Sequence, residues 1–280
     1  QTATEQFSYQ ATDGSVTVTS GLTITIDGEN DAPVVEADAG QLQVSSHVLA
    51  GNVLSNDSDV DTGTVLRTEA VVLQGQYGQL TFTETGDYRY ELTADLAALA
   101  DGEVIQDSFN YAVNDGITAV TSQLVINIIG ENDAPILTAD SLRLSEDAIS
   151  GTGNVLSNDS DIDHGSSLSV VAQQLQGQYG TLNLLANGEY SYAVNRALTQ
   201  QLAAGQTATE QFSYQATDGS VTVTSGLTIT IDGENDAPIL TADSLRLSED
   251  ALSGTGNVLS NDRDIDHGSS LSVVAQQLQG

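Results

Sequence analysis

Three short runs of aspartate are the residues best suited to bind a ligand, because each run places carboxylates at positions i, i+2 and i+4. Carboxylates at this spacing converge when the backbone curves around a centre. A dense set of oxygen ligands suits Ca²⁺, which takes about six to eight oxygens, better than Mg²⁺, which demands strict octahedral geometry. The candidate calcium ligands in these acidic loops are Asp57, Asp59, Asp61, Asp159, Asp161, Asp163, Asp262, Asp264 and Asp266.

The acidic loops do not follow the EF-hand pattern. Gly165 falls at the seventh position of the loop that starts at Asp159, and Val170 occupies the twelfth, whereas an EF-hand has glycine at the sixth and glutamate at the twelfth. The alternative interpretation is a solvated loop in which Asn and Asp stabilise turns locally. The repetition of the acids in one register favours metal binding. Charge repulsion favours it too, because carboxylates held this close without a cation would raise one another's pKa and push the loop apart.

A second group of acids lies in the pentapeptide ENDAP, which occurs three times and contains all three prolines of the chain. Proline fixes φ and lacks an amide hydrogen, so the motif is typical of a short, stiff linker that leads into an edge strand. Its carboxylates and amide oxygens are further candidate metal ligands. They are Glu29, Asn30, Asp31, Glu131, Asn132, Asp133, Glu234, Asn235 and Asp236.

Two smaller sets of acids complete the candidate metal ligands. One is a Glu-Asp pair that occurs twice, and the other is an aspartate that precedes glycine in a predicted hairpin turn. These residues are Glu146, Asp147, Glu249, Asp250, Asp115 and Asp218. The alternatives are solvated surface for the pairs and ordinary turn residues for the aspartates. An earlier copy of the repeat has Val44 and Ser45 in place of the pair, which weakens any site that needs it there.

The chain is built from repeats of about one domain length. Residues 1–33 return letter for letter as 206–238, and the ENDAP motif begins at residues 29, 131 and 234. The sequence predicts the back part of one repeat at 1–28, full repeats at 29–130 and 131–233, and the front part of another at 234–280. We expect the chain to be a piece of a longer protein.

The sequence pattern predicts an all-β fold. Residues 220–231 alternate polar and apolar side chains, as in a half-buried strand, and Asn187-Gly188 and Asp218-Gly219 are strong hairpin signals. About seven short strands per repeat indicate an antiparallel β-sandwich of the immunoglobulin-like type, repeated in tandem about every 100 residues. We expect single helical turns around 94–100 and 198–204, and we expect the recurring tyrosines and phenylalanines to fill the core.

The composition excludes several classes of function. The formal net charge is -33, with six Lys and Arg residues against 39 Asp and Glu. Nucleic-acid binding needs clustered basic residues, and anionic lipid would repel this chain. The chain has no cysteine, which removes disulfides and thiol catalysis, and it has no apolar run of membrane-spanning length. We therefore predict no nucleic-acid partner and no membrane insertion of this segment.

At this point the motifs resemble a known family. Residues 179–238 are similar to the VCBS repeat of bacterial surface proteins, sharing GTL, NGEYSY, AAGQT, QFSY, the TDG hairpin and NDAP in that order. Residues 142–163 resemble the front of a bacterial cadherin-like repeat. The resemblance implies tandem cadherin-like sandwiches in a large adhesin of the RTX type, exported by type I secretion to the cell surface and acting in attachment and biofilms.

The resemblance also implies how the repeats work. ENDAP is similar to the DxNDNAP linker of cadherins, whose Asp and Asn residues bind Ca²⁺ between domains, although one asparagine is missing here. The leading hypothesis is that calcium joins neighbouring repeats into a stiff extender, while other domains bind the glycan or cell-surface ligand. The alternative is a repeat that itself binds glycans or another cell. We predict no enzymatic activity, because the paired acids lie in repeated loops without catalytic asymmetry.

Overall fold

The computed structural model describes residues 1–274, and it divides into two compact units, Gln1–Glu131 and one that begins at Asn132. Each unit is described by itself. Nearly all of the regular structure is β-strand. Within residues 1–274, no helix has the length and hydrophobicity needed to cross a membrane.

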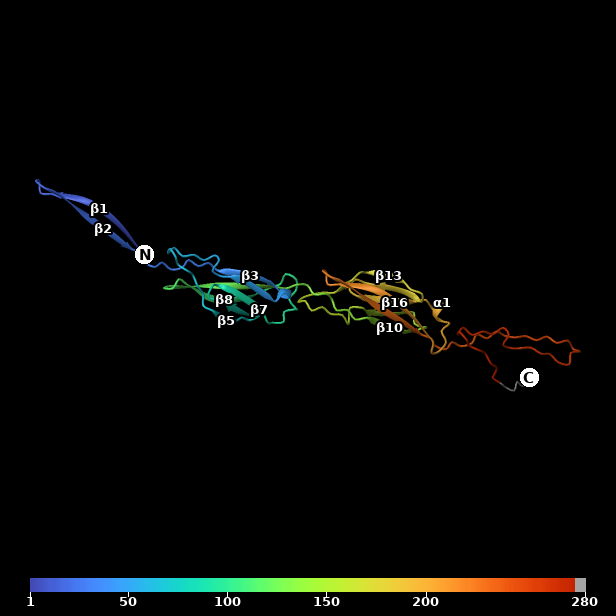
Figure 1. The fold of residues 1–280 in the computed structure, drawn as a ribbon. Helices are drawn as coiled ribbons and strands as arrows, with labels where there is room; N and C mark the ends of the chain where they lie inside the picture. The colour runs from blue at the N-terminus through green and yellow to red at the C-terminus, as the bar shows by residue number, and fades with distance from the viewer. Residues whose placement is uncertain (275–280) are drawn as a thin grey trace. The chain divides into compact units, whose positions relative to one another are not determined.

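The first unit contains a two-stranded hairpin and the first full repeat. The hairpin is formed by β1 (Thr2–Thr12) and β2 (Thr17–Asp27) (Figure 1). The repeat has one sheet in the order β3-β9-β8 and another in the order β4-β7-β6-β5. The strands are β3 (Asp38–Gln43), β4 (Val48–Asn52), β5 (Val71–Gln74), β6 (Gly78–Phe82), β7 (Asp87–Leu92), β8 (Val104–Asn114) and β9 (Ala119–Ile129). A short 3₁₀ helix, η1 (Val44–Ser46), joins β3 to β4.

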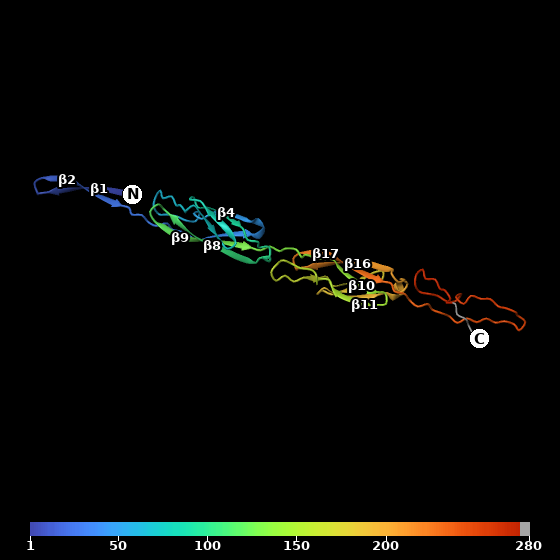
Figure 2. The same cartoon turned by 90° about the horizontal axis from the view of Figure 1, so that it is seen from below.

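The second unit contains the second full repeat, with sheets in the orders β10-β17-β16-β12 and β11-β15-β14-β13 (Figures 1 and 2). Its strands are β10 (Asp140–Ser145), β11 (Ser150–Asn154), β12 (Ser169–Val170), β13 (Gln173–Gln176), β14 (Gly180–Leu184), β15 (Glu189–Val194), β16 (Thr207–Thr217) and β17 (Thr222–Asp232). Residues 234–274 follow, and apart from an isolated bridge they consist of turns and irregular backbone. The predicted all-β sandwich is confirmed.

The predicted hairpins form where the glycines allow them. Gly188 has a φ of 83° and Gly219 a φ of 106°, a region in which side chains other than glycine are strained. These turns connect β14 to β15 and β16 to β17. One local detail differs from an antiparallel sandwich. The edge strands β3 and β10 pair in parallel with β9 and β17, because the chain crosses from one sheet to the other before it returns.

Each full repeat has its own hydrophobic core between its two sheets. In the second repeat, Tyr192, Leu182 and Ile229 are among the side chains with at most 1% of their surface exposed. The rings of Tyr192 and Phe212 pack edge to face, with their centroids 6.1 Å apart. Two edge-to-face pairs in the first repeat have centroid distances of 6.0 and 6.4 Å. The expectation that the aromatic residues fill the core holds in both full repeats.

Two segments of identical sequence differ in their exposure. Phe7 and Ile24 of the β1–β2 hairpin are 45% and 42% exposed, whereas Phe212 and Ile229, their counterparts in β16 and β17, are 7% and 0% exposed. The hairpin therefore forms from local pairing alone, and the burial of the same side chains depends on a facing sheet. This pair of copies supplies matched controls for experiments on the second repeat.

The predicted helical turns form in one repeat only. The second repeat has α1 (Arg196–Thr199), slightly earlier in the chain than expected. In the first repeat, residues 94–100 form turns and no helix. There the side chain of Asp95 accepts a hydrogen bond from the amide of Ala97 at 3.3 Å, a local bond that competes with helix formation.

Candidate metal centres

Each acidic loop is folded by hydrogen bonds to its own aspartates. In the first repeat, Asp59 Oδ1 accepts a bond from the amide of Asp61 at 2.8 Å, and Asp57 Oδ1 accepts one from the amide of Glu36 at 2.9 Å. The same two bonds recur in the other two loops. One oxygen of each of these carboxylates is thus fixed by backbone, which leaves the second oxygen to face another group.

The linker is held against the acidic loop of the repeat that it enters. Val34, which follows the first ENDAP motif, forms an isolated β-bridge with Ser58, in the middle of the acidic loop. The amide of Asp31 donates to Asp61 Oδ2 at 2.8 Å, and the equivalent bonds at the next two linkers measure 3.0 and 3.1 Å. The two groups of candidate ligands, about 30 residues apart in sequence, are therefore neighbours in all three copies.

The hairpin aspartates also belong to this end of each full repeat. Asp218 Oδ1 accepts the amides of Ser220 and Val221, as a turn residue does, and its Oδ2 accepts Asn132 Nδ2 at 3.0 Å. These bonds, led by that of Val221, lower the pKa of Asp218. Asp115 makes the same contact with Asn30 at 2.9 Å. These aspartates therefore act as turn residues, and each also orients the asparagine of the linker.

The acidic loops and linkers contain buried oxygens that lack hydrogen-bond partners. Among the described residues, every buried side-chain oxygen or nitrogen without a partner is a carboxylate oxygen of a candidate ligand. Burying a carboxylate oxygen without a partner is costly, so these oxygens fit the ligands of a cation better than the acids of a solvated loop. The residues are Asp57, Asp59, Glu146, Asp159, Asp161, Asp163, Asp236 and Asp266.

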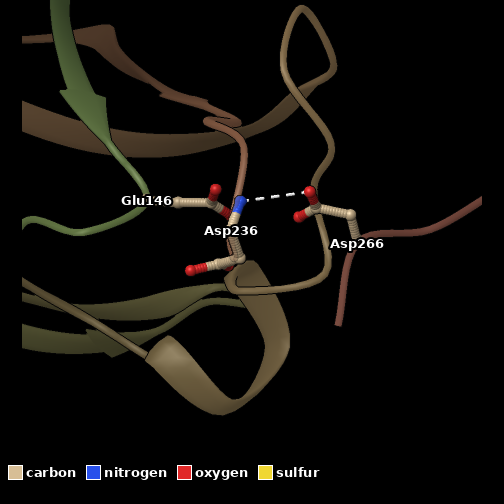
Figure 3. A group of neighbouring side chains, drawn as sticks. All are labelled: Glu146, Asp236 and Asp266. Atoms are coloured by element: carbon tan, nitrogen blue, oxygen red, sulfur yellow. Dashed lines mark hydrogen bonds between the residues drawn. The ribbon is translucent and has the colours of Figure 1, made fainter. Parts of the chain in front are cut away.

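Three of these acids form a compact cluster. Glu146, Asp236 and Asp266 each offer a carboxylate oxygen, and these oxygens lie within 4.8 Å of one another (Figure 3). Glu146 and Asp266 are only 1% and 7% exposed. The backbone positions two of the carboxylates: the amide of Glu234 donates to Glu146 Oε1 at 2.7 Å, and the amide of Asp236 donates to Asp266 Oδ2. We call this group the three-acid cluster.

The electrostatics of the three-acid cluster are unfavourable without a cation. Burial raises the pKa of Glu146, and the nearby charges of Asp236 and Asp266 raise it further, against the opposing hydrogen bond from Glu234. Burial also raises the pKa of Asp236, followed by repulsion from Asp266. A divalent cation would remove this repulsion and pair the free oxygens. All of the donors are oxygens, as Ca²⁺ prefers.

Other predicted ligands lie outside such clusters. Glu29, Glu249 and Asp250 are exposed. Glu131 accepts a hydrogen bond from the amide of Ser45 at 2.9 Å. Asp147 is exposed and pairs with Arg196 at 3.0 Å.

Sequence reasoning missed a pair of half-buried aspartates beside the acidic loops. Asp38 accepts a hydrogen bond from the hydroxyl of Tyr111, and Asp140 accepts one from Tyr214 at 2.8 Å. Burial raises the pKa of both carboxyls. Each of these aspartates follows its ENDAP motif at the same interval, and that recurrence is a signal that could have identified them.

Sequence reasoning also missed a second type of enclosed acid. Asp107, only 3% exposed, accepts bonds from the amides of Gln76, Tyr77 and Gly78 and from the hydroxyl of Tyr90. Glu210 takes this place in the second repeat. Asp107 has donors on both oxygens, so it stabilises a turn and offers no free oxygen to a metal.

The fold and the repeated motifs place the chain in a family. A model of the bacterial cadherin-like domain matches residues 30–130 and 132–233. The chain belongs to this family of bacterial cadherin-like domains.

The chain is similar in sequence to a calcium-binding lectin. The calcium-binding lectin RapA2 of Rhizobium johnstonii (strain DSM 114642 / LMG 32736 / 3841) is 36% identical over 235 residues, covering 72% of this chain and 97% of the lectin.

Solved structures support the fold alone. The protocadherin gamma B4 extracellular domain matches with a TM-score of 0.55 and 19% identity over 95% of this chain. Protocadherin gamma B3 EC1-4 matches with a TM-score of 0.51 and 16% identity over 90% of this chain. The chain spans 43% and 64% of these two structures, which is less than two thirds of either.

Proposed function

We propose that this chain is a calcium-binding adhesion module of a bacterial surface protein, in which Ca²⁺ joins consecutive repeats. The observation that carries the proposal is the set of buried, unpartnered carboxylate oxygens in the acidic loops and linkers. In the three-acid cluster, Glu146 belongs to one repeat, Asp236 to the linker that follows it, and Asp266 to the acidic loop beyond. A cation bound by all three would couple these segments, because its binding energy is available only when they are folded together.

We propose that the repeats act as an extender that carries other domains away from the cell, after export by type I secretion, in attachment and biofilm formation. The similarity to a calcium-binding lectin and the family membership both point to binding and adhesion rather than to catalysis. Extracellular modules can use sites with dissociation constants of about 10⁻⁴–10⁻³ M, because calcium is plentiful outside the cell.

Calcium titration of the chain tests the proposal. We expect calorimetry to show several bound ions and thermal melting to show a midpoint that rises with calcium and falls on chelation. Small-angle X-ray scattering should show a shorter particle after chelation. Equal stability and equal length with and without calcium would refute both the calcium role and the extender role.

A second candidate function is direct glycan binding. It is favoured by the similarity to a lectin and by an open groove of about 820 Å³ in the first repeat, lined by polar side chains that include Arg67, Glu84 and Asn114. Arg67 and Glu84 form an ion pair at 3.7 Å across its wall. A glycan array probed with calcium present separates the candidates, because an extender should bind nothing, whereas a lectin should bind and lose binding in the Arg67→Ala variant.

A further inference from the structure

A positive charge lies beside the three-acid cluster. Asp147 follows Glu146 in the chain, and its Oδ1 accepts a bond from Arg196 Nη2 at 3.0 Å and another from Gln200 Nε2 at 3.0 Å. Arg196 is the first residue of α1, and Gln200 is the residue at its carboxyl end. The short helix thus presents a guanidinium and an amide to the acid next to the cluster.

Asp147 is the residue after Glu146, so the guanidinium that it binds lies next to the cluster. Asp147 is one of the negative charges that raise the pKa of Asp236, and Arg196 is the positive charge that opposes them. Asp147 likewise acts on Glu146. Arg196 and Asp147 form an exposed ion pair, which contributes little to the stability of the fold. The main effect of Arg196 is therefore expected on the charge of the cluster.

The first repeat has no counterpart of Glu146, Asp147 or Arg196. Where the second repeat has Glu146, Asp147 and Arg196, the first has Val44, Ser45 and Ala94. The arginine is therefore present in the full repeat that has the acidic pair and absent from the one that does not. Arg196 thus occurs together with the acid that it contacts.

We propose that Arg196 sets the calcium affinity of the three-acid cluster by acting as a resident counter-charge. This inference rests on the proposed function. Without calcium, the guanidinium holds Asp147 and offsets part of the negative charge around the cluster. When a divalent cation binds, the same guanidinium repels it, so the affinity is lower than the acids alone would give. Arg196 does not touch the cation and acts through the field at the cluster and through Asp147.

The test compares Arg196→Gln, Arg196→Lys and Arg89→Gln by calcium calorimetry. The calcium ion of the three-acid cluster is identified as the one that the Glu146→Gln variant no longer binds. We expect Arg196→Gln to bind it about two- to fivefold more tightly at low ionic strength, and this gain should shrink in 0.5 M salt. Arg196→Lys keeps the charge and should bind as the wild type does. Arg89→Gln makes the same change in net charge on β7 of the first repeat, and it should have no effect on this ion.

Thermal melting supplies a second measurement, in which Arg196→Gln should lower the melting temperature without calcium and increase its rise when calcium is added. In the absence of calcium, Arg196→Gln should melt at a lower temperature than the wild type, because the cluster loses its counter-charge. The rise on adding calcium should be larger. In the double variant Arg196→Gln/Glu146→Gln, the effect on calcium affinity should disappear.

Wild-type or weaker calcium affinity in Arg196→Gln would overturn the inference while leaving the site intact. If Glu146→Gln loses no ion at all, the proposed function fails at this cluster, and the inference about Arg196 fails with it. The two failures are thus distinguished by the Glu146→Gln variant alone.

Discussion

Two glutamates of the second repeat differ in how their oxygens are paired. Glu210 accepts a bond from the amide of Tyr179 at 3.1 Å and another from the hydroxyl of Tyr192, so both of its oxygens are occupied. Glu146 has one paired oxygen and one buried oxygen without a partner. The pairing suits them to different roles: Glu210 can stabilise the fold without a metal, and we expect the free oxygen of Glu146 to bind a cation.

Glu210→Ala should destabilise the second repeat whether or not calcium is present. Removing the carboxylate leaves the buried hydroxyl of Tyr192 unpaired, at a cost of about 1–3 kcal/mol. Glu5→Ala is the matched control, because Glu5 stands in the identical sequence of the exposed hairpin and should change stability by less than about 0.5 kcal/mol. Thermal melting in calcium and in chelator measures both variants, and a loss seen only in calcium would contradict this role.

Glu146→Gln should remove one bound calcium ion and reduce the stabilisation by calcium. The amide keeps the size of the side chain but provides no negative charge and only one ligand oxygen. Glu249→Gln is its control, since Glu249 is the aligned residue of the next repeat and is exposed. Calorimetric stoichiometry checks the prediction, and an unchanged ion count in Glu146→Gln would show that this acid is no ligand.

At the scale of elements, the β16–β17 hairpin orients the linker that enters its repeat. The turn aspartate Asp218 contacts Asn132 through one oxygen and its own turn through the other. Asp13 makes the same turn contacts in the identical β1–β2 hairpin. The hairpin tip therefore has a role beyond turn formation that the turn sequence does not reveal.

Asp218→Asn should preserve the hairpin and weaken calcium binding at the linker of the second repeat. Its amide can still accept the turn bonds through oxygen, but it places NH₂ against the NH₂ of Asn132. Loss of a residue that orients a ligand lowers metal affinity by roughly tenfold. Asp13→Asn is the control and should leave calcium affinity unchanged. Calorimetry decides, and equal effects of the two substitutions would contradict the linker role.

Much of the fold could be predicted because it is determined by residues that are close together in the sequence. The Asn187-Gly188 and Asp218-Gly219 turns, the alternation along β17 and the recurrence of ENDAP each depend on neighbouring residues. The candidate ligands were recognised for the same reason, as dense acids in a repeated register. Whether each residue within those sets binds a metal stays a prediction.

The parts that could not be predicted depend on contacts between distant residues. Nothing in the local sequence shows that Asp31 meets Asp61 or that Asp38 lies beneath Tyr111. The two repeats also differ at their expected helical turns, where Asp95 accepts a hydrogen bond from the amide of Ala97 in the first repeat and α1 forms in the second. Likewise, the exposed Glu249 and the buried Glu146 share their local sequence, so only the surrounding fold distinguishes them.

At the scale of the whole molecule, the net charge of -33 makes the protein sensitive to its ionic surroundings. Like charges repel one another in a compact state, and bound divalent cations offset that repulsion where the acids are densest. Protons can play part of this role in the absence of calcium. The response of stability to pH should therefore depend on whether calcium is bound.

Without calcium, stability should fall as the pH rises from about 4 to 7. Burial raises the pKa of Asp38, Asp57, Asp140, Glu146 and Asp236 in the folded protein. A carboxyl with a raised pKa in the folded state contributes stability below its unfolded value, near 4, and that contribution is lost as the pH passes through the folded value. The half-buried turn acids Asp115 and Asp218 have lowered pKa values, so their opposite effect is confined to lower pH.

With saturating calcium, the slope should reverse, because protons compete with the cation for the same oxygens and stability should fall as the pH falls. Melting curves from pH 4 to 7 measure both slopes, using protein freed of calcium by ion exchange so that no chelator titrates in the same range. Glu146→Gln should flatten both slopes, since it removes one of the titrating ligands, and Glu249→Gln should leave them unchanged. Slopes of the same sign with and without calcium would mean that the buried carboxyls and the cation do not share a site.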